Sequence, residues 1–239
     1  MTLPKLDHPT FTIKVPSTSE NVHFRPMTVR EEKILLMAKT SEDSDLPEAI
    51  MQVLNNCIID HVNLTELTIF DIEYLFMMLR SQSISNIVKV SYRDPEDDKV
   101  RDFEIDLAKV KLQNLPDEIK PEMLTIEGNS EYKLEMIYPK ASLYINEHFK
   151  SLTDPTDIEM ALIGSSIGAV WIGDSRTSVE GETPEEVNSF IESLDVKTFD
   201  QVRNFVLRMP NLYHEIKWKN EKGTERSVVL KTLSDFFTF

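Results

Sequence analysis

The sequence predicts an α+β fold in which β-hairpins pack with helices, and in which the C-terminal half is mainly helical with a terminal hairpin. Pairs of short segments alternate apolar and polar residues around turn residues, which is the pattern of β-hairpins. Capping residues stand before segments whose apolar residues repeat at helical spacing. These strands and helices follow one another without the spacing of βαβ units, which favours α+β over a parallel sheet.

The N-terminal segment predicts a hairpin followed by two helices. "FTIKV" and "NVHFR" flank the turn-like "PSTSE", so the hairpin covers Phe11 to Arg25. "TVREEKILLMAK" opens with Thr28 and Glu31 at the spacing of a capping box, which starts a helix there. "PEAIMQVLNNCII" predicts a second helix, with Pro47 in its first turn.

The stretch "FDIEYLFMMLRSQSIS" predicts a third helix that begins near Thr68. One apolar stripe at helical spacing is formed by Ile69, Ile72, Leu75, Phe76 and Leu79. Large side chains spread beyond this stripe at Phe70, Tyr74, Met77 and Met78. A helix that is apolar over much of its circumference is either buried on several sides or contacts a partner. We expect the stripe to lie in the core and the excess, Phe70, Met77 and Met78 especially, to face a partner.

A second hairpin is predicted in "NIVKVSYRDPEDDKVRDFEIDL", with strands over Ile87–Tyr92 and Val100–Leu107. The segment from Leu115 to Ser130 is punctuated by Pro and Gly and is the best candidate for a domain boundary. We therefore predict an N-terminal α+β lobe, residues 1–115, and a mainly helical C-terminal lobe with a terminal hairpin, residues 116–239. A single merged domain is the alternative, since the break is only moderately linker-like.

The C-terminal half predicts one strand, "YKLEMIYP", a short helix in "ASLYINEHFKSL", and three longer helices. The longer helices are predicted from capping residues: Asp154 as N-cap with Pro155 at the first helical position, and capping boxes of Thr183 with Glu186 and of Thr198 with Gln201. "LYHEIKWKNEKGTERSVVL" predicts a final hairpin that turns near Gly223. The tail that follows carries Phe236, Phe237 and Phe239, which must pack on the body of the protein or on a partner.

Composition excludes several classes of function. Hydrophobic residues make up 41% of the 239 residues and charged residues 28%, which predicts a soluble globular protein with a core. The net charge of −15 repels phosphate backbones, so nucleic acid and anionic membranes are not expected partners. The longest near-apolar run, Met160–Ile172, is too short to cross a bilayer, and "MTLPKLDHPT" lacks an apolar signal core. With one cysteine, Cys57, and five scattered histidines, we expect no internal disulfide, metal site or cofactor.

The sharpest catalytic motif is "GSSIG", which fits G-x-S-x-G with Ser166 as the nucleophile. A nucleophile elbow needs a strand before it and a helix after it. Here the motif follows helix-starting residues, and nothing in the sequence brings acid and base partners such as Asp195 and His214 to it. We expect Gly164 and Gly168 instead to be small residues one helical turn apart that let another helix approach.

Two charged clusters also have functional and structural interpretations. "DPEDD", Asp94 to Asp98, lacks the spacing and closing glutamate of an EF-hand, so a solvated hairpin tip is favoured over a calcium site. "RPMTVREE" is interpreted first as a helix start with favourable acidic residues, and second as a charged docking edge. Its charged residues are Arg25, Arg30, Glu31 and Glu32.

Four segments together carry a family likeness: "FTIKVPSTSENVHFRPMTVREEKILLMAK", "NNCI", "FDIEYLFMMLRSQSISNIVKVSYRD" and the final "YHEIKWKNEKGTERSVVLKTLSDFF". They resemble the baseplate hub assembly proteins of T-even-like contractile-tailed bacteriophages. The order of the "VPST" loop, "FRP" and "EEK" before a hydrophobic run is fairly specific, whereas residues 115–209 carry no such likeness. Many members of that family have Cys-x-x-Cys in the corresponding hairpin. This chain has "YRDPEDDK" there, without a cysteine, so no metal knuckle is expected.

The resemblance implies a non-enzymatic assembly factor that acts in the host cytoplasm to build the central baseplate hub and binds tape-measure or hub proteins. A structural hub subunit retained in the virion baseplate is one alternative, and a serine hydrolase using Ser166 is another. The residues place the expected contact surface on the second and third helices with the aromatic tail. Its members are Phe70, Tyr74, Leu75, Phe76, Met77, Met78, Phe236, Phe237 and Phe239.

Overall fold

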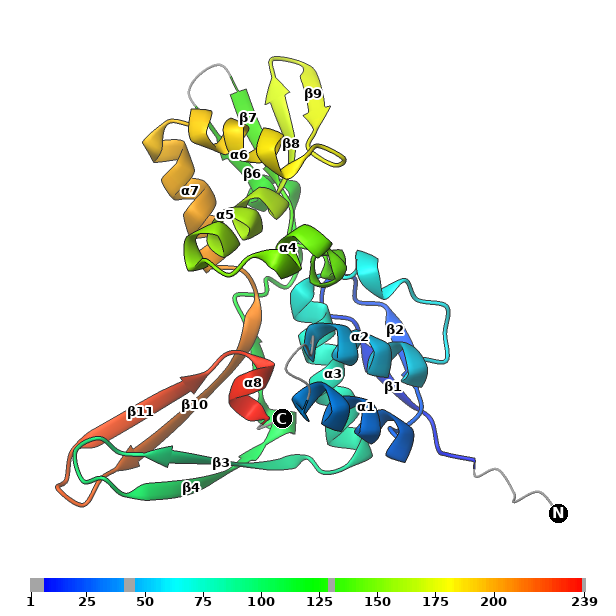
Figure 1. Cartoon of the computed structure of the whole chain (residues 1–239), viewed down its shortest axis with the longest axis vertical. Coiled ribbons are helices and arrows are strands. Elements are labelled where there is room, and N and C mark those ends of the chain that lie inside the picture. The colour runs from blue at the N-terminus through cyan, green and yellow to red at the C-terminus, as the bar shows by residue number, and fades with distance from the viewer. Residues whose placement is uncertain (1–6, 41–45, 129–131, 238–239) are drawn as a thin grey trace. The chain divides into compact units, whose positions relative to one another are not determined.

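The computed structural model describes residues 7–40, 46–128 and 132–237. Contacts divide the chain into two compact units. Unit 1 comprises Met1–Leu64, Phe70–Gln113 and Pro210–Phe239, and unit 2 comprises Thr65–Ile69 and Asn114–Met209. The terminal hairpin, which we expected in the second lobe, therefore belongs to unit 1 (Figure 1).

Unit 1 is a mixture of helices and antiparallel strands (Figure 1). Its α-helices are α1 (Val29–Thr40), α2 (Leu46–Cys57), α3 (Ile69–Ser83) and α8 (Leu233–Phe236). Its strands are β1 (Phe11–Lys14), β2 (Asn21–Phe24), β3 (Ile87–Arg93), β4 (Val100–Asp106), β5 (Lys111–Gln113), β10 (Asn211–Lys219) and β11 (Glu225–Leu230). The short 3-10 helices are η1 (Leu64–Glu66), which spans the division between the units, and η2 (Leu107–Lys109).

The predicted N-terminal hairpin and the three helices after it are confirmed. β1 and β2 pair antiparallel, with Phe11 opposite Phe24. The loop between them is attached to α3, because the Ser17 backbone N–H and hydroxyl donate to the Asp71 carboxylate at 2.9 and 2.6 Å. The Asp71 side chain is buried, so its charge is compensated by hydrogen bonds from a loop distant in sequence.

Two hairpins and one extra strand complete unit 1. β3 pairs with β4, and β11, β10 and β5 form a three-stranded antiparallel sheet. The β10–β11 turn contains Gly223 with a φ of +83°, a conformation that glycine adopts without a steric cost. The rings of Phe103 on β4 and Trp218 on β10 lie 5.2 Å apart, so the two hairpins pack against each other.

Unit 2 is built around a four-stranded sheet in the order β6-β7-β8-β9. Its strands are β6 (Thr125–Glu127), β7 (Tyr132–Met136), β8 (Ile167–Ile172) and β9 (Ser175–Ser178). Its helices are η3 (Pro121–Leu124), η4 (Ala141–Ile145), α4 (Glu147–Ser151), α5 (Pro155–Ser165), α6 (Pro184–Ser193) and α7 (Val196–Leu207). One core joins sheet and helices, with Leu134, Met136, Ile163, Ile167, Val170, Ile191 and Val202 buried together.

The prediction of a mainly helical C-terminal half was wrong. Strands β6 to β11 all lie in that half, and the helix that begins at Pro155 ends at Ser165 (Figure 1). The reason is local: Gly and Ser at 164–166 are poor helix formers, and the following "IGAVWI" is rich in the β-branched and aromatic residues that favour strands. A two-residue Gly173–Asp174 turn then returns the chain as β9.

The predicted helix starts are confirmed at α5 and α6 and are wrong at α7. Asp154 caps α5, and Thr183 with Glu186 forms the capping box of α6. At α7 the cap is Asp195, whose carboxylate accepts from the Thr198 backbone N–H at 3.0 Å. Thr198 therefore lies in the first turn of α7. No helix among the described residues is long and apolar enough to span a membrane.

Candidate functional site

The apolar set predicted to contact a partner lies largely in the core of unit 1. On α3, the side chains of Phe70, Leu75, Phe76 and Met77 are buried, whereas Tyr74 and Met78 keep intermediate exposure. Phe236 and Phe237 of the tail are buried as well, and Phe239 lies outside the described residues. Burial on several sides therefore accounts for the apolar excess of α3, and a role in partner binding stays a prediction.

The C-terminal tail covers α3. The rings of Phe76 and Phe237 meet edge to face with centroids 6.0 Å apart. The guanidinium carbon of Arg80 lies 4.7 Å from the centre of the Phe237 ring, a cation–π contact. The Arg80 Nε is buried without a hydrogen-bond partner among the described residues, and the Phe237 ring and the negative charge of Glu32 both offset its desolvation.

A partly buried carboxyl, that of Glu73, lies near the same tail. Burial, with a smaller contribution from the negative charge of Asp235 on α8, raises the pKa of Glu73 to about 7. The Asp235 carboxylate is held at the start of α8 by the backbone N–H of Thr232 at 2.9 Å. The contact between tail and α3 therefore combines aromatic packing with one carboxyl group that ionises near neutral pH.

The "GSSIG" motif has the reverse of the arrangement that a nucleophile elbow requires. Helix α5 precedes it and strand β8 follows it, and Ser166 is buried with its hydroxyl donating to the Leu162 carbonyl at 2.8 Å. Asp195 is occupied as the cap of α7, and His214 belongs to unit 1. The motif therefore has no geometry for nucleophilic catalysis.

The two glycines of the motif serve close packing, but only one of them faces a helix. A Cβ at Gly164 would lie 2.8 Å from a methyl carbon of Val187, so this glycine lets α5 approach α6 as predicted. Gly168 lies in β8, not in a helix, and a Cβ there would lie 2.7 Å from a methyl carbon of Ile137. The prediction of two small residues on one helix face was wrong for Gly168.

The "RPMTVREE" cluster is a structural ion pair at the start of α1. Arg25 bonds to the buried Glu31 carboxylate at 3.0 and 3.2 Å, and Glu31 also accepts from the backbone N–H and hydroxyl of Thr28. Burial alone would raise the pKa of Glu31, but these hydrogen bonds outweigh it and lower the pKa to about 2. Nearby, burial raises the pKa of the Cys57 thiol to about 11, so it is not a reactive thiolate.

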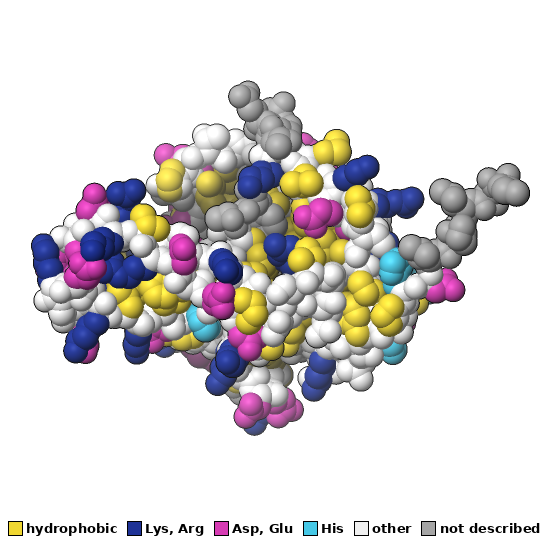
Figure 2. Space-filling view, turned by 90° about the horizontal axis from the view of Figure 1, so that it is seen from below, with side chains coloured by type: hydrophobic (Ala, Val, Ile, Leu, Met, Phe, Trp, Pro, Cys, Tyr) yellow, Lys and Arg dark blue, Asp and Glu magenta, His cyan; other side chains and the backbone are white. Residues whose placement is uncertain are grey.

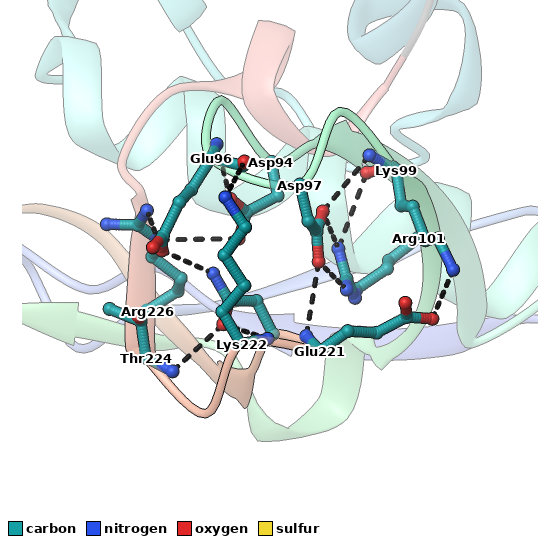
Figure 3. Close-up of polar contacts among 10 residues, drawn as sticks. Asp94, Glu96, Asp97, Lys99, Arg101, Glu221, Lys222, Thr224 and Arg226 are labelled. Atoms are coloured by element: carbon teal, nitrogen blue, oxygen red, sulfur yellow. Dashed lines mark hydrogen bonds and ion pairs between the residues drawn. The ribbon is translucent and has the colours of Figure 1, made fainter.

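The acidic "DPEDD" turn is bonded to the turn of the β10–β11 hairpin (Figure 3). Arg226 reaches the Asp94 carboxylate at 3.3 Å and that of Glu96 at 2.9 Å. The Asn220 amide donates to Glu96 at 2.7 Å. The expected solvated tip holds only in part, because Pro95, Glu96 and Asp98 are exposed whereas the Asp94 side chain is buried.

Further ion pairs surround the same two turns. The Arg101 guanidinium, by its hydrogen bonds, holds the pKa of Asp97 well below its usual range, and Lys99 pairs with Glu221. Basic and acidic side chains are interspersed on this end of unit 1 (Figure 2). Among the residues that the structure describes, no group of three or more His, Cys, Asp or Glu side chains is placed to hold a metal ion.

Unit 2 contains a groove of about 760 Å³ that sequence reasoning missed. One wall is the segment of η4 and α4, with Phe149, and another is α5, with Met160. Ser178 at the end of β9 and Val187 on α6 line it as well. No single stretch of sequence signals this groove, because its lining comes from segments spread between Glu135 and Asn188.

The groove has an excess of acidic side chains. Two of its basic groups are already paired, since Arg176 bonds to Glu135 at 2.9 Å and Lys140 bonds to Glu66 at 2.7 Å. The groove is also lined by Asp157, Glu180 and Glu182. Combined with apolar side chains on its walls, this lining fits a partner surface that carries both positive charge and apolar groups.

Comparison with known families adds a match over nearly the whole chain. The model of the family described as T4 bacteriophage base plate protein matches residues 8–238, including the central segment that carried no likeness in the sequence analysis. No curated protein and no solved structure matches the chain. Since the family model covers both units, the chain belongs to the T4 bacteriophage base plate protein family.

Proposed function

We propose that this chain is a non-catalytic assembly factor for the central hub of a phage baseplate, and that it acts by binding hub or tape-measure proteins. The observation that carries the proposal is the family match over residues 8–238. The likeness of the N-terminal segments and the final hairpin to hub assembly proteins supports the finer assignment. The buried hydroxyl of Ser166 and the reversed order of elements around it favour binding over catalysis.

Two surfaces are available for such binding. The groove of unit 2 is open in the monomer and combines apolar walls with acidic groups. On α3, Tyr74 and Met78 keep partial exposure, whereas Phe76 would become accessible only if the tail left α3. We therefore propose Tyr74 and Met78 as direct contacts, and Phe76 as a side chain that a partner reaches by displacing the tail. For the other members of the predicted surface, a role in binding stays a prediction.

The experiment that tests the proposal is a pull-down of the tagged full chain from phage-infected cells, followed by mass spectrometry. Recovery of hub or tape-measure proteins above the level of an untagged control is the expected result. Recovery of no phage baseplate protein would overturn the proposed function.

Analysis of purified virions separates an assembly factor from a retained subunit. An assembly factor is absent or present in trace amounts in the mature particle, whereas a structural hub subunit has a fixed copy number. The proposal predicts absence, and a constant ratio to other baseplate proteins would replace it with the structural role.

A further inference from the structure

We propose that the free edge of β9 and the groove of unit 2 together bind an extended, basic segment of a partner protein, which adds to the four-stranded sheet as a further strand. The inference rests on the proposed function, because it locates the contact that this function requires. It commits to a segment of another protein with alternating apolar and basic side chains.

The edge of β9 offers backbone groups to such a segment. β9 is the last strand in the order β6-β7-β8-β9, and its residues Ser175–Ser178 are all exposed. The Val179 backbone N–H donates to the Gly168 carbonyl at 3.1 Å, which makes this position a bonded pair. Bonded and non-bonded pairs alternate in an antiparallel ladder, so the N–H and C=O groups of Arg176 and Ser178 point away from β8. They form the template for strand addition.

The groove lies where a segment on that edge would place its side chains. Arg176 and Ser178 line the groove as well as the outer edge of β9. Beyond them the walls carry Phe149, Met160 and Val187, which can hold apolar side chains. A strand places alternate side chains on opposite faces, so one set can enter the groove while backbone hydrogen bonds fix the register.

The charge of the groove selects a basic segment. Arg176 and Lys140 are bonded to Glu135 and Glu66, and the charge of Lys140 acts on Glu180 as well. Asp157, Glu180 and Glu182 together still leave an excess of negative charge in the lining. A segment with Lys or Arg beside its apolar residues would pair with these groups. The same charge argues against a second copy of this chain, which would bring an identical acidic groove and a net charge of −15 against its own.

The test compares tagged wild-type chain with Ser178→Pro and Ser178→Ala in pull-downs from phage-infected cells, with each baseplate protein quantified. Proline removes the outward N–H and leaves the bonds of Thr177 to β8, whereas alanine keeps the N–H and removes only the hydroxyl. The Ser178 hydroxyl accepts from the Glu180 backbone N–H at 3.1 Å, and both variants lose this bond. S178A is therefore the reference, and we expect S178P to recover about tenfold less hub or tape-measure protein than S178A does. Thermal melting of the purified variants establishes that each is folded.

A second pair of variants keeps the test decisive if S178P does not fold. Reversing Glu180 and Glu182 to Lys should lower recovery at least as strongly, whereas reversing the exposed Glu104 and Glu225 changes the net charge equally and should leave recovery unchanged. Equal recovery by all variants would overturn the inference and leave the proposed function standing. Predominant recovery of untagged copies of this chain would also overturn it. Recovery of no baseplate protein by wild type would end both proposals.

Discussion

The two units differ in what their hairpins leave available to other molecules. In unit 1, the charged turn of β3–β4 is bonded to the turn of β10–β11 (Figure 3). The aromatic tail also packs on α3 in this unit. In unit 2, the β8–β9 hairpin ends in an exposed edge strand beside an open groove. The difference shows why residue type alone is a poor guide to a binding surface. The apolar residues of α3 pack against the aromatic tail, and the charged residues of one turn pair with those of the other. The outer edge of the polar "SRTS" strand, by contrast, is exposed.

The largest expected effect comes from opening the interior of unit 1. Replacing Phe76 by Ala removes a fully buried ring and its edge contact with Phe237, which should lower the free energy of unfolding by about 3–5 kcal/mol. Met78→Ala is the matched control, because its side chain is only partly buried and should cost clearly less. Urea denaturation measures both. Equal losses would mean that α3 is not packed more tightly on the side of the tail.

The next effect is a gain in stability that depends on pH. The pKa of Glu73 is raised to about 7, so ionisation above that pH costs stability, and the cost disappears below the ordinary pKa near 4.5. Glu73→Gln should therefore stabilise the protein at pH 8 by up to about 3 kcal/mol, and should change little at pH 4. Unfolding measured at both pH values tests this. A gain that is equal at both would show that the carboxyl does not titrate in this range.

A third effect concerns the packing of unit 2. Gly164→Ala places a methyl group 2.8 Å from a methyl carbon of Val187, which should destabilise the fold by about 1–3 kcal/mol. Val187→Ala removes the methyl carbon that would clash. G164A should therefore cost less stability in the V187A background than in the wild type. A double-mutant cycle by thermal or urea denaturation gives the coupling. Additive losses would mean that the two helices do not meet at this point.

The smallest expected effect compares one arginine from each hairpin. Arg226 bonds to the buried Asp94, whereas Arg176 bonds to the partly exposed Glu135. Arg226→Gln should therefore lower the denaturation midpoint more than Arg176→Gln does, and added salt should screen the exposed pair more strongly. A larger effect of R176Q would reverse the contrast between the bonded turns of unit 1 and the free edge of unit 2.

Local signals predicted those parts of the fold whose causes are local. The capping box of Thr183 and Glu186 and the cap at Asp154 placed two helix starts, and alternation around "PSTSE" placed the first hairpin. The same reasoning failed at Ser165, where helix and strand patterns meet within one apolar run. Periodicity cannot separate a short buried strand from the end of a helix when both are apolar.

The contacts that define the candidate sites depend on residues far apart in the chain. Arg226 and Asp94 are 132 residues apart in the sequence. The tail that packs on Phe76 belongs to the last sequence segment of unit 1, whereas α3 belongs to the middle one. Complementary charges in "DPEDD" and "NEKGTER" were the one available hint of the joined turns. The groove could not be predicted from the sequence, because strand β9, which borders it, lacks the alternation of apolar and polar residues that indicates a strand.

The division of the chain also orders its synthesis. In the sequence, both segments of unit 2 fall between segments of unit 1. Strands β10 and β11 and helix α8 are therefore translated after unit 2. Domains tend to fold as they leave the ribosome, so unit 2, with its groove and edge strand, can form while α3 still lacks the aromatic residues that cover it. A nascent chain therefore exposes the apolar surface of α3 for a period set by the rate of translation. Codon usage across residues 114–209 would then change how long that surface is open to chaperones or to misassembly.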